Sequence, residues 1–186
     1  QPMLWSPSGR GTDGLESGVS SHGAIELFFN PRIAKSAEEL VAENQILLLP
    51  LPAWGHKRVM DDLAPHIAQG QQVIISSHAS MGALYLMRLI KTRGFSIPIT
   101  AWGTTSVTGR REAGPVVRVN TVRSKIDLCT IPEDLSKDAM TICHQLLNDR
   151  FEPRAGLLAI SLSNLNPQNH LGIALGNITR MERGEV

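Results

Sequence analysis

The chain has 186 residues, of which 42% are hydrophobic and 19% charged, and its formal net charge is +1. A charge so close to zero indicates neither a nucleic acid nor a membrane surface as partner, because both attract strongly basic proteins. No apolar run approaches the roughly 20 residues of a membrane-spanning helix, and the N-terminal residues do not read as a signal peptide.

The middle of the chain alternates short apolar runs with amphipathic segments. The runs are too short for helices and are typical of strands buried on both faces. Each amphipathic segment repeats apolar residues at helical spacing and ends near a glycine. We predict strands at 46–49, 73–75 and 97–102, and helices over 59–67 and 84–90. This order predicts an α/β fold with a Rossmann-type parallel sheet.

Further along, the chain adds two strands and then only helices. Residues 116–122 and 125–131 alternate apolar and polar side chains, so we expect an antiparallel pair. A helix is predicted over 135–148, and the pattern after Pro153 is helical only. We therefore predict two domains: a Rossmann-type domain over 1–150 and the start of an all-helical domain over 151–186.

The cysteines and histidines give no sign of a metal site. Cys129 and Cys143 lie singly in apolar surroundings. We expect two buried thiols in a reducing cytoplasm, with one disulfide as the alternative. The six histidines contain no pair at metal-ligand spacing.

A glycine motif near the N-terminus matches a dinucleotide fingerprint only in part. Gly9, Gly11 and Gly14 form G-x-G-x-x-G, a pattern that needs a strand before it and a helix after it. The segment that follows is too rich in glycine and serine for that helix. Because the chain does not begin with methionine and Met3 to Trp5 already reads as a strand, we interpret it as a fragment. The first strand and the true glycine loop would then precede residue 1.

The residues after this first strand indicate which nucleotide binds. If Met3 to Trp5 is the second strand of a Rossmann unit, its carboxyl end faces the adenosine ribose. An NAD site usually places Asp or Glu there, whereas this chain has Ser6, Ser8 and Arg10. Hydroxyl groups and a guanidinium suit a ribose 2′-phosphate. We therefore predict NADP as cofactor, with NAD as the alternative; a solvated loop is the other interpretation.

In doubly wound sheets, ligands bind beyond the carboxyl ends of the strands. Loops over 50–56, 76–82 and 102–109 occupy such positions and carry small or polar residues with Gly or Pro. The predicted cofactor-binding residues are Leu51, Pro52, Ala53, His56, Ser77 and His78, and the predicted substrate-binding residues are Thr104 and Thr105. For both histidines, a capping or surface role is the alternative.

The stretch SLSNLNPQNHLG interrupts a helical run with polar groups. Pro167 suits the first position of a helix and Asn166 its N-cap. His170 then falls near the first turn, where the positive helix end disfavours an imidazolium and leaves a neutral base. Asn166 lies four residues away on neighbouring surface, and we predict that it contacts substrate. The alternative is a buried histidine satisfied by asparagines.

Three stretches, ILLLPLPAWGH, LAPHIAQGQQVII and above all SLSNLNPQNH, resemble the octopine/nopaline (opine) dehydrogenases. The most specific element is the pattern S-x-x-N-x-N-x-x-x-H of Ser161, Asn164, Asn166 and His170. The resemblance implies a Rossmann domain, a helical domain and an active site between them. It also implies that His170 is the catalytic acid/base, with an aspartate partner beyond this chain. The implied reaction joins an amino acid to a 2-keto acid with NAD(P)H, or reverses that step.

Two alternatives remain from the sequence. Enzymes of the ketopantoate reductase or 6-phosphogluconate dehydrogenase type rely on a catalytic lysine in the helical domain, and no lysine lies between Ala155 and Val186. A catalytically silent dinucleotide-binding module is the second alternative. An unfinished helical segment exposes an apolar face, so we also expect a homodimer or another partner chain.

Overall fold

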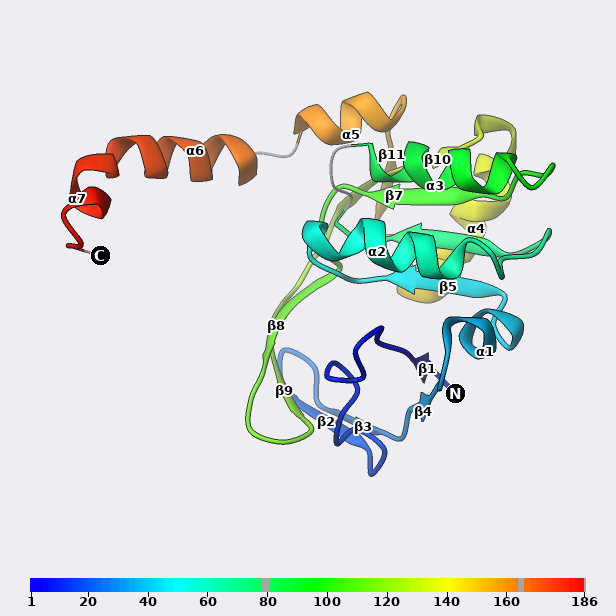
Figure 1. Ribbon diagram of the computed structural model, residues 1–186, viewed down its shortest axis with the longest axis horizontal. Coiled ribbons are helices and arrows are strands. Elements are labelled where there is room, and N and C mark those ends of the chain that lie inside the picture. The colour runs from blue at the N-terminus through cyan, green and yellow to red at the C-terminus, as the bar shows by residue number, and fades with distance from the viewer. Residues whose placement is uncertain (78–80, 164–165, 186) are drawn as a thin grey trace.

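The computed structural model describes residues 1–77, 81–163 and 166–185, and within α6 side chains are described from Asn169 onward. A five-stranded sheet of order β11-β10-β7-β6-β5 forms its centre (Figure 1). Its strands are β5 (Ile46–Leu49), β6 (Gln72–Ile75), β7 (Ile99–Trp102), β10 (Ile126–Ile131) and β11 (Phe151–Pro153). β5, β6 and β7 run parallel, and β10 lies antiparallel to β7. The Rossmann-type α/β prediction is confirmed, in a sheet that is mixed at one end.

Helices cover both faces of this sheet, which explains why the central strands β6 and β7 are fully buried and mostly apolar. α2 (Ala53–Leu63) and α3 (Gly82–Lys91) lie on one face, where Val73 and Ile75 join the main core. α4 (Ser136–Leu147), preceded by the short η1 (Glu133–Leu135), covers the other face. There Ile74 and Trp102 belong to a second core cluster. All residues of β6 and β7 are buried, as the apolar runs predict.

The predicted antiparallel pair of 116–122 and 125–131 is wrong. β9 (Val116–Val122) belongs to a separate four-stranded sheet of order β3-β2-β9-β8, whereas β10 pairs with β7. The other strands of that sheet are β2 (Val19–Gly23), β3 (Leu27–Phe29) and β8 (Val107–Arg111). The two predicted partners have different environments: β9 is largely exposed, whereas β10 is mostly buried between helical layers. Alternation along each strand does not report which neighbour it has.

The first strand is present, but it does not pair with the central sheet. β1 (Met3–Leu4) and β4 (Arg32–Ile33) form a parallel two-stranded sheet of their own. The short helix α1 (Ala37–Ala42) follows; Ser36 Oγ accepts from the Glu39 amide, and Glu39 Oε2 accepts from the Lys35 amide. These two bonds hold the start of α1 beside the end of β4.

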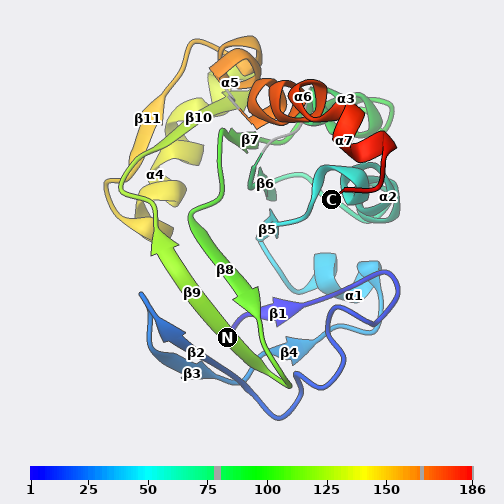
Figure 2. The ribbon, with the colours of Figure 1, turned by 90° about the vertical axis from the view of Figure 1, so that its left-hand side faces the viewer.

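After Pro153 the described residues form only helices, as predicted: α5 (Leu157–Ser163), α6 (Asn166–Gly176) and α7 (Ile178–Glu182). Leu157 and Ile160 of α5 belong to the main core, so the chain beyond residue 150 begins against the central sheet. α6 and α7 extend away from it, on the side where α2 begins (Figures 1 and 2). Their apolar side chains are exposed, namely Leu171, Ile173, Leu175, Ile178 and Met181.

Cys129 and Cys143 are buried free thiols, as expected. Burial raises the pKa of the Cys129 thiol to about 11, and it also raises that of Cys143. Neither sulfur is a ready nucleophile at neutral pH. None of the described helices combines the length and the apolar character that a membrane crossing requires.

Candidate functional site

The loop after β5 leads directly into α2 at the carboxyl edge of the central sheet. Leu51 is half-buried, whereas Pro52 and Ala53 are exposed. The N-cap position is Pro52, and no side chain caps the helix. The first amides of α2 therefore have no side-chain partner and are available to an oxygen-bearing ligand. This geometry suits the predicted cofactor contacts of these three residues.

His56 lies in the first turns of α2 and is only 4% exposed. Its Nε2 is 2.9 Å from the carbonyl oxygen of Leu51, so that nitrogen donates. Its Nδ1 is buried and has no hydrogen-bond partner among the described residues. The alternative interpretation of His56 as a surface histidine is therefore wrong. The ring contacts the loop after β5 from the protein interior and is not exposed to a bound cofactor.

The loop after β6 carries two residues with left-handed backbone. Ser77 has φ 61° and Met81 has φ 66°, and α3 begins immediately afterwards at Gly82. Such conformations cost non-glycine residues about 1–3 kcal/mol and cluster at ligand-binding sites. Ser77 is half-buried at this point. The predicted contact His78 lies outside the described residues.

The loop after β7 contains the predicted substrate contacts Thr104 and Thr105, both half-buried. Their hydroxyl groups have no hydrogen-bond partner within the part of the chain that the structure describes. The preceding Gly103 donates its amide to the Asp127 carbonyl, 2.8 Å away, and a side chain there would press against Asp127. Arg154 pairs with the Asp127 carboxylate at 2.9 Å. The loop is thus anchored to β10, with its two hydroxyls left available.

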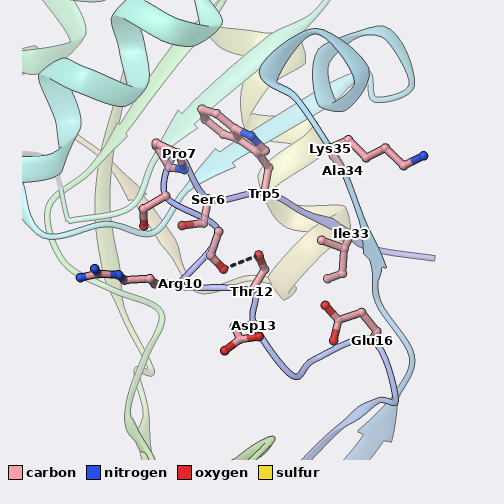
Figure 3. Close-up of a pocket in the computed structure, with 12 residues that line it drawn as sticks. Trp5, Ser6, Pro7, Arg10, Thr12, Asp13, Glu16, Ile33, Ala34 and Lys35 are labelled. Atoms are coloured by element: carbon pink, nitrogen blue, oxygen red, sulfur yellow. Dashed lines mark hydrogen bonds between the residues drawn. The ribbon is translucent and has the colours of Figure 1, made fainter.

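A pocket of about 550 Å³ opens at the end of β1 (Figure 3). It contains the predicted Ser6, Ser8 and Arg10, and it adds Lys35 from the end of β4. The other lining residues are Trp5, Pro7, Gly9, Thr12, Asp13, Glu16, Ile33 and Ala34. Figure 3 shows Arg10 and Lys35 on opposite sides of the pocket, with the carboxylates of Asp13 and Glu16 below. Two cations and two carboxylates therefore border one space.

Sequence reasoning missed Lys35, Asp13 and Glu16 as members of this pocket. Lys35 joins it because β4 pairs with β1 across more than twenty intervening residues. That pairing leaves no local signal in the sequence. The spacing from Arg10 to Asp13 and Glu16 could have signalled a carboxylate-bearing loop.

The glycine-rich segment folds as a series of turns. The Gly9 amide donates to the Ser6 carbonyl and the Thr12 amide donates to the Gly9 carbonyl, each at a distance of 3.0 Å. The Gly11 amide donates to Ser6 Oγ at 3.3 Å. The next element after Gly14 is β2 and not a helix, in line with the sequence pattern. The turns instead shape the pocket wall.

α6 begins at Asn166, one residue before the predicted first position. His170 is exposed and makes no hydrogen bond or ion pair with another described residue. The alternative of a buried histidine is therefore wrong. The side chain of Asn166 and all of Asn164 lie outside the described residues. The structure does not bring His170 into contact with the loops or with the pocket.

Among the described residues, no three His, Cys, Asp or Glu side chains gather as a metal site. The candidate site consists of the strand-end loops, the start of α2 without a capping side chain, and the mixed-charge pocket. These features fit a ligand with phosphate, ribose and amide groups.

No protein-family model matches the chain. A curated relative, the opine dehydrogenase of Arthrobacter sp. (strain 1C), is 27% identical over 146 residues, which cover 77% of this chain and 40% of that protein. The chain thus spans less than half the length of this relative.

Solved structures share the fold at low identity. Octopine dehydrogenase with NADH and pyruvate has a TM-score of 0.69 at 16% identity, covering 81% of this chain and 42% of that one. NADP⁺-bound yersinopine dehydrogenase has 0.68 at 14%, covering 88% and 44%. A 2-dehydropantoate 2-reductase from Enterococcus faecalis has 0.60 at 14%, covering 84% and 50%. The chain is thus similar in sequence to an opine dehydrogenase, and it shares its fold with several solved dehydrogenase and reductase structures.

Proposed function

We propose that the protein containing this chain is an NAD(P)H-dependent opine-type dehydrogenase. It condenses an amino acid with a 2-keto acid and reduces the resulting imine, or oxidises the secondary amine in reverse. The observation that carries the proposal is the open carboxyl edge of β5, β6 and β7, on a chain that matches an opine dehydrogenase over 77% of its length. Ligands of doubly wound sheets bind at this edge.

The residues present fit a nicotinamide dinucleotide. The pocket at the end of β1 offers hydroxyls and a guanidinium for the adenosine ribose. Leu51 and Pro52 lead into α2, whose first amides, from Ala53 onward, have no capping side chain. Ser77, in its left-handed conformation, borders the next loop. When bound, the nicotinamide supplies or accepts the hydride. The protein residues bind, orient and exclude water around it.

The preference for NADP rests on the pocket at the end of β1. Ser6 and Ser8 can donate to phosphate oxygens, and Arg10 and Lys35 bring positive charge from two sides. The carboxylates of Asp13 and Glu16 repel a 2′-phosphate. The preference for NADP over NAD therefore depends on how close each of the four charges lies to the ribose. NAD is the alternative cofactor.

Reduction of an imine moves a proton together with the hydride, so the protein needs one group that transfers this proton. We assign that role to His170, near the start of α6. Support comes from the exposure of His170 on α6, which extends away from the central sheet on the side where α2 begins (Figure 1). The exposed apolar face of α6 and α7 fits a partner surface, from further chain or from a second copy, that would bring His170 to the cleft. Asn166, Thr104 and Thr105 would orient the substrate.

The protein is proposed to act in the cytoplasm, where two unpaired buried thiols are stable. The full-length protein should oxidise NADPH when an amino acid and a 2-keto acid are supplied together. Neither substrate alone should support turnover. Nucleotide absorbance follows the reaction.

The closest competing function is that of a ketopantoate reductase, because a 2-dehydropantoate 2-reductase shares the fold. Such an enzyme would reduce a 2-keto acid without any amine, which separates it from our proposal. A silent nucleotide-binding module would bind NADPH and turn over no pair of substrates.

A further inference from the structure

His56 places both nitrogens of one buried ring at the carboxyl edge of the central sheet. We infer that His56 is a positioning residue, which fixes the loop after β5 and links it to the start of α3. The inference rests on the proposed function, because it concerns the two loops that would hold the nicotinamide half of the cofactor.

The first contact is with the loop after β5. His56 Nε2 lies 2.9 Å from the Leu51 carbonyl oxygen, and the ring is 4% exposed. Leu51 lies between Pro50 and Pro52, which fix φ and have no amide hydrogens to bond elsewhere. The bond to His56 therefore supplies a hydrogen-bonded anchor for this segment. It also turns the Leu51 acceptor inward, so that the loop does not present that carbonyl to a phosphate or ribose oxygen.

The ring of His56 also lies near the start of α3. A Cβ at Gly82 would lie 3.9 Å from His56 Nδ1 and 3.6 Å from Met60 Cε. Gly82 is the first residue of α3 and follows the left-handed Met81. The ring therefore fills the space between the two helix starts, and any shift of α2 or α3 changes its packing.

Packing alone does not explain an imidazole at this position. Nδ1 is a buried acceptor without a partner among the described residues, which costs free energy. A leucine of similar volume would fill the space without that cost. What the imidazole adds is the donor to Leu51. The geometry of the loop, and not the stability of the core, is what this side chain determines.

The test compares three variants of the full-length protein. In His56→Gln the amide nitrogen can reach the place of Nε2 and donate to Leu51; in His56→Asn it cannot, and His56→Leu has no donor. The matched control is His66→Gln, because His66 is exposed near the end of α2. We expect KM for NADPH to rise about 10-fold in the Asn and Leu variants, from loss of one buried bond. Gln should stay within about 3-fold of the wild type, and kcat should change less than KM.

Hydrogen exchange of residues 51–56, measured without nucleotide, provides an arm that does not depend on the cofactor. Exchange should become about 10-fold faster in the Asn and Leu variants but not in the Gln variant. If the wild type binds no nucleotide, the proposed function fails. The hydrogen-exchange measurement still tests the positioning role of His56. Equal exchange in the Asn and Gln variants overturns it. Faster exchange in the Asn and Leu variants with an unchanged KM for NADPH also overturns the positioning role, because the loop would then not shape the nucleotide site. If the Leu variant does not fold, the comparison of Gln with Asn decides.

Discussion

Tyr85 Oη donates a 2.5 Å hydrogen bond to Asp61 Oδ1, which joins α3 to α2 through side chains. Lys57 Nζ lies 2.7 Å from the other carboxylate oxygen and 5.2 Å from the centre of the Tyr85 ring. These three residues hold together the two helices whose first turns border the candidate site.

The Asp61 carboxylate should make stability depend on acid pH. Donation from Lys57, and then from Tyr85, lowers the pKa of Asp61 below its ordinary value. The folded state therefore favours the carboxylate, and this contribution is present above about pH 4 and is lost as pH falls below that. Asp61→Asn should lower Tm at pH 7, and the difference from wild type should shrink toward pH 3.

Asp62→Asn is the matched control for this prediction. Asp62 is the next residue on α2, and its carboxylate is 3.3 Å from Arg58 in an exposed pair. The pair of Asp61 with Lys57 is equally exposed, and exposed pairs of this kind contribute little. Asp62 accepts no bond from Tyr85, so the Tm of Asp62→Asn should differ little from wild type. A Tm difference for Asp61→Asn that is constant between pH 7 and pH 3 would contradict the assignment.

The pocket at the end of β1 should discriminate between the two nucleotides. Arg10→Ala in the full-length protein should weaken NADPH binding about 10-fold or more, because a charge-assisted bond to phosphate is lost. NADH affinity should change little. Titration of each nucleotide against tryptophan fluorescence is a direct measurement, since Trp5 lines this pocket.

Two further variants make the nucleotide prediction specific. Asp13→Asn removes a like charge from the same pocket, so NADPH affinity should rise. Arg88→Ala removes an exposed arginine on α3 and should leave both affinities unchanged. Equal losses of NADH and NADPH affinity in Arg10→Ala would remove the argument for a 2′-phosphate.

His170→Ala should separate chemistry from binding. In the full-length protein we expect kcat to fall by about 10²–10⁴, the usual contribution of an acid–base group. NADPH affinity should be retained, because the nucleotide contacts lie on other elements. His66→Ala replaces an exposed histidine on a different segment and should keep full activity. Unchanged turnover in His170→Ala would exclude the catalytic role.

The two thiols should be silent in the native protein. Cys129 and Cys143 are buried, and the pKa of Cys129 is about 11. A thiol reagent at pH 8 should therefore label neither cysteine until denaturant is added, and then both. Rapid labelling of the folded protein would mean that the core opens readily around Cys129, in the main cluster, or around Cys143, in the second cluster.

Local patterns predicted the elements that touch the core. The runs at 46–49 and 73–75 are strands at those positions: the 73–75 run is fully buried in β6, and Leu47 and Leu49 of β5 are buried. Helix bounds were less accurate: α2 begins at Ala53, before the predicted start, because Ala53 and Trp54 are exposed and form no apolar repeat. α1 escaped prediction for a similar reason, since only Ala37 and Val41 of its six residues are buried.

The sequence by itself determined the Rossmann-type alternation, the loops at the strand ends and the segment that carries His170. Each depends on residues close together in the chain, so periodicity and turn residues report it. Only the tertiary structure decided that β10 pairs with β7 and that Lys35 joins Arg10 around one pocket. It also decided that His56 is buried against Leu51. These are consequences of which distant segments pack together, and alternation within a segment is the same whichever neighbour it meets.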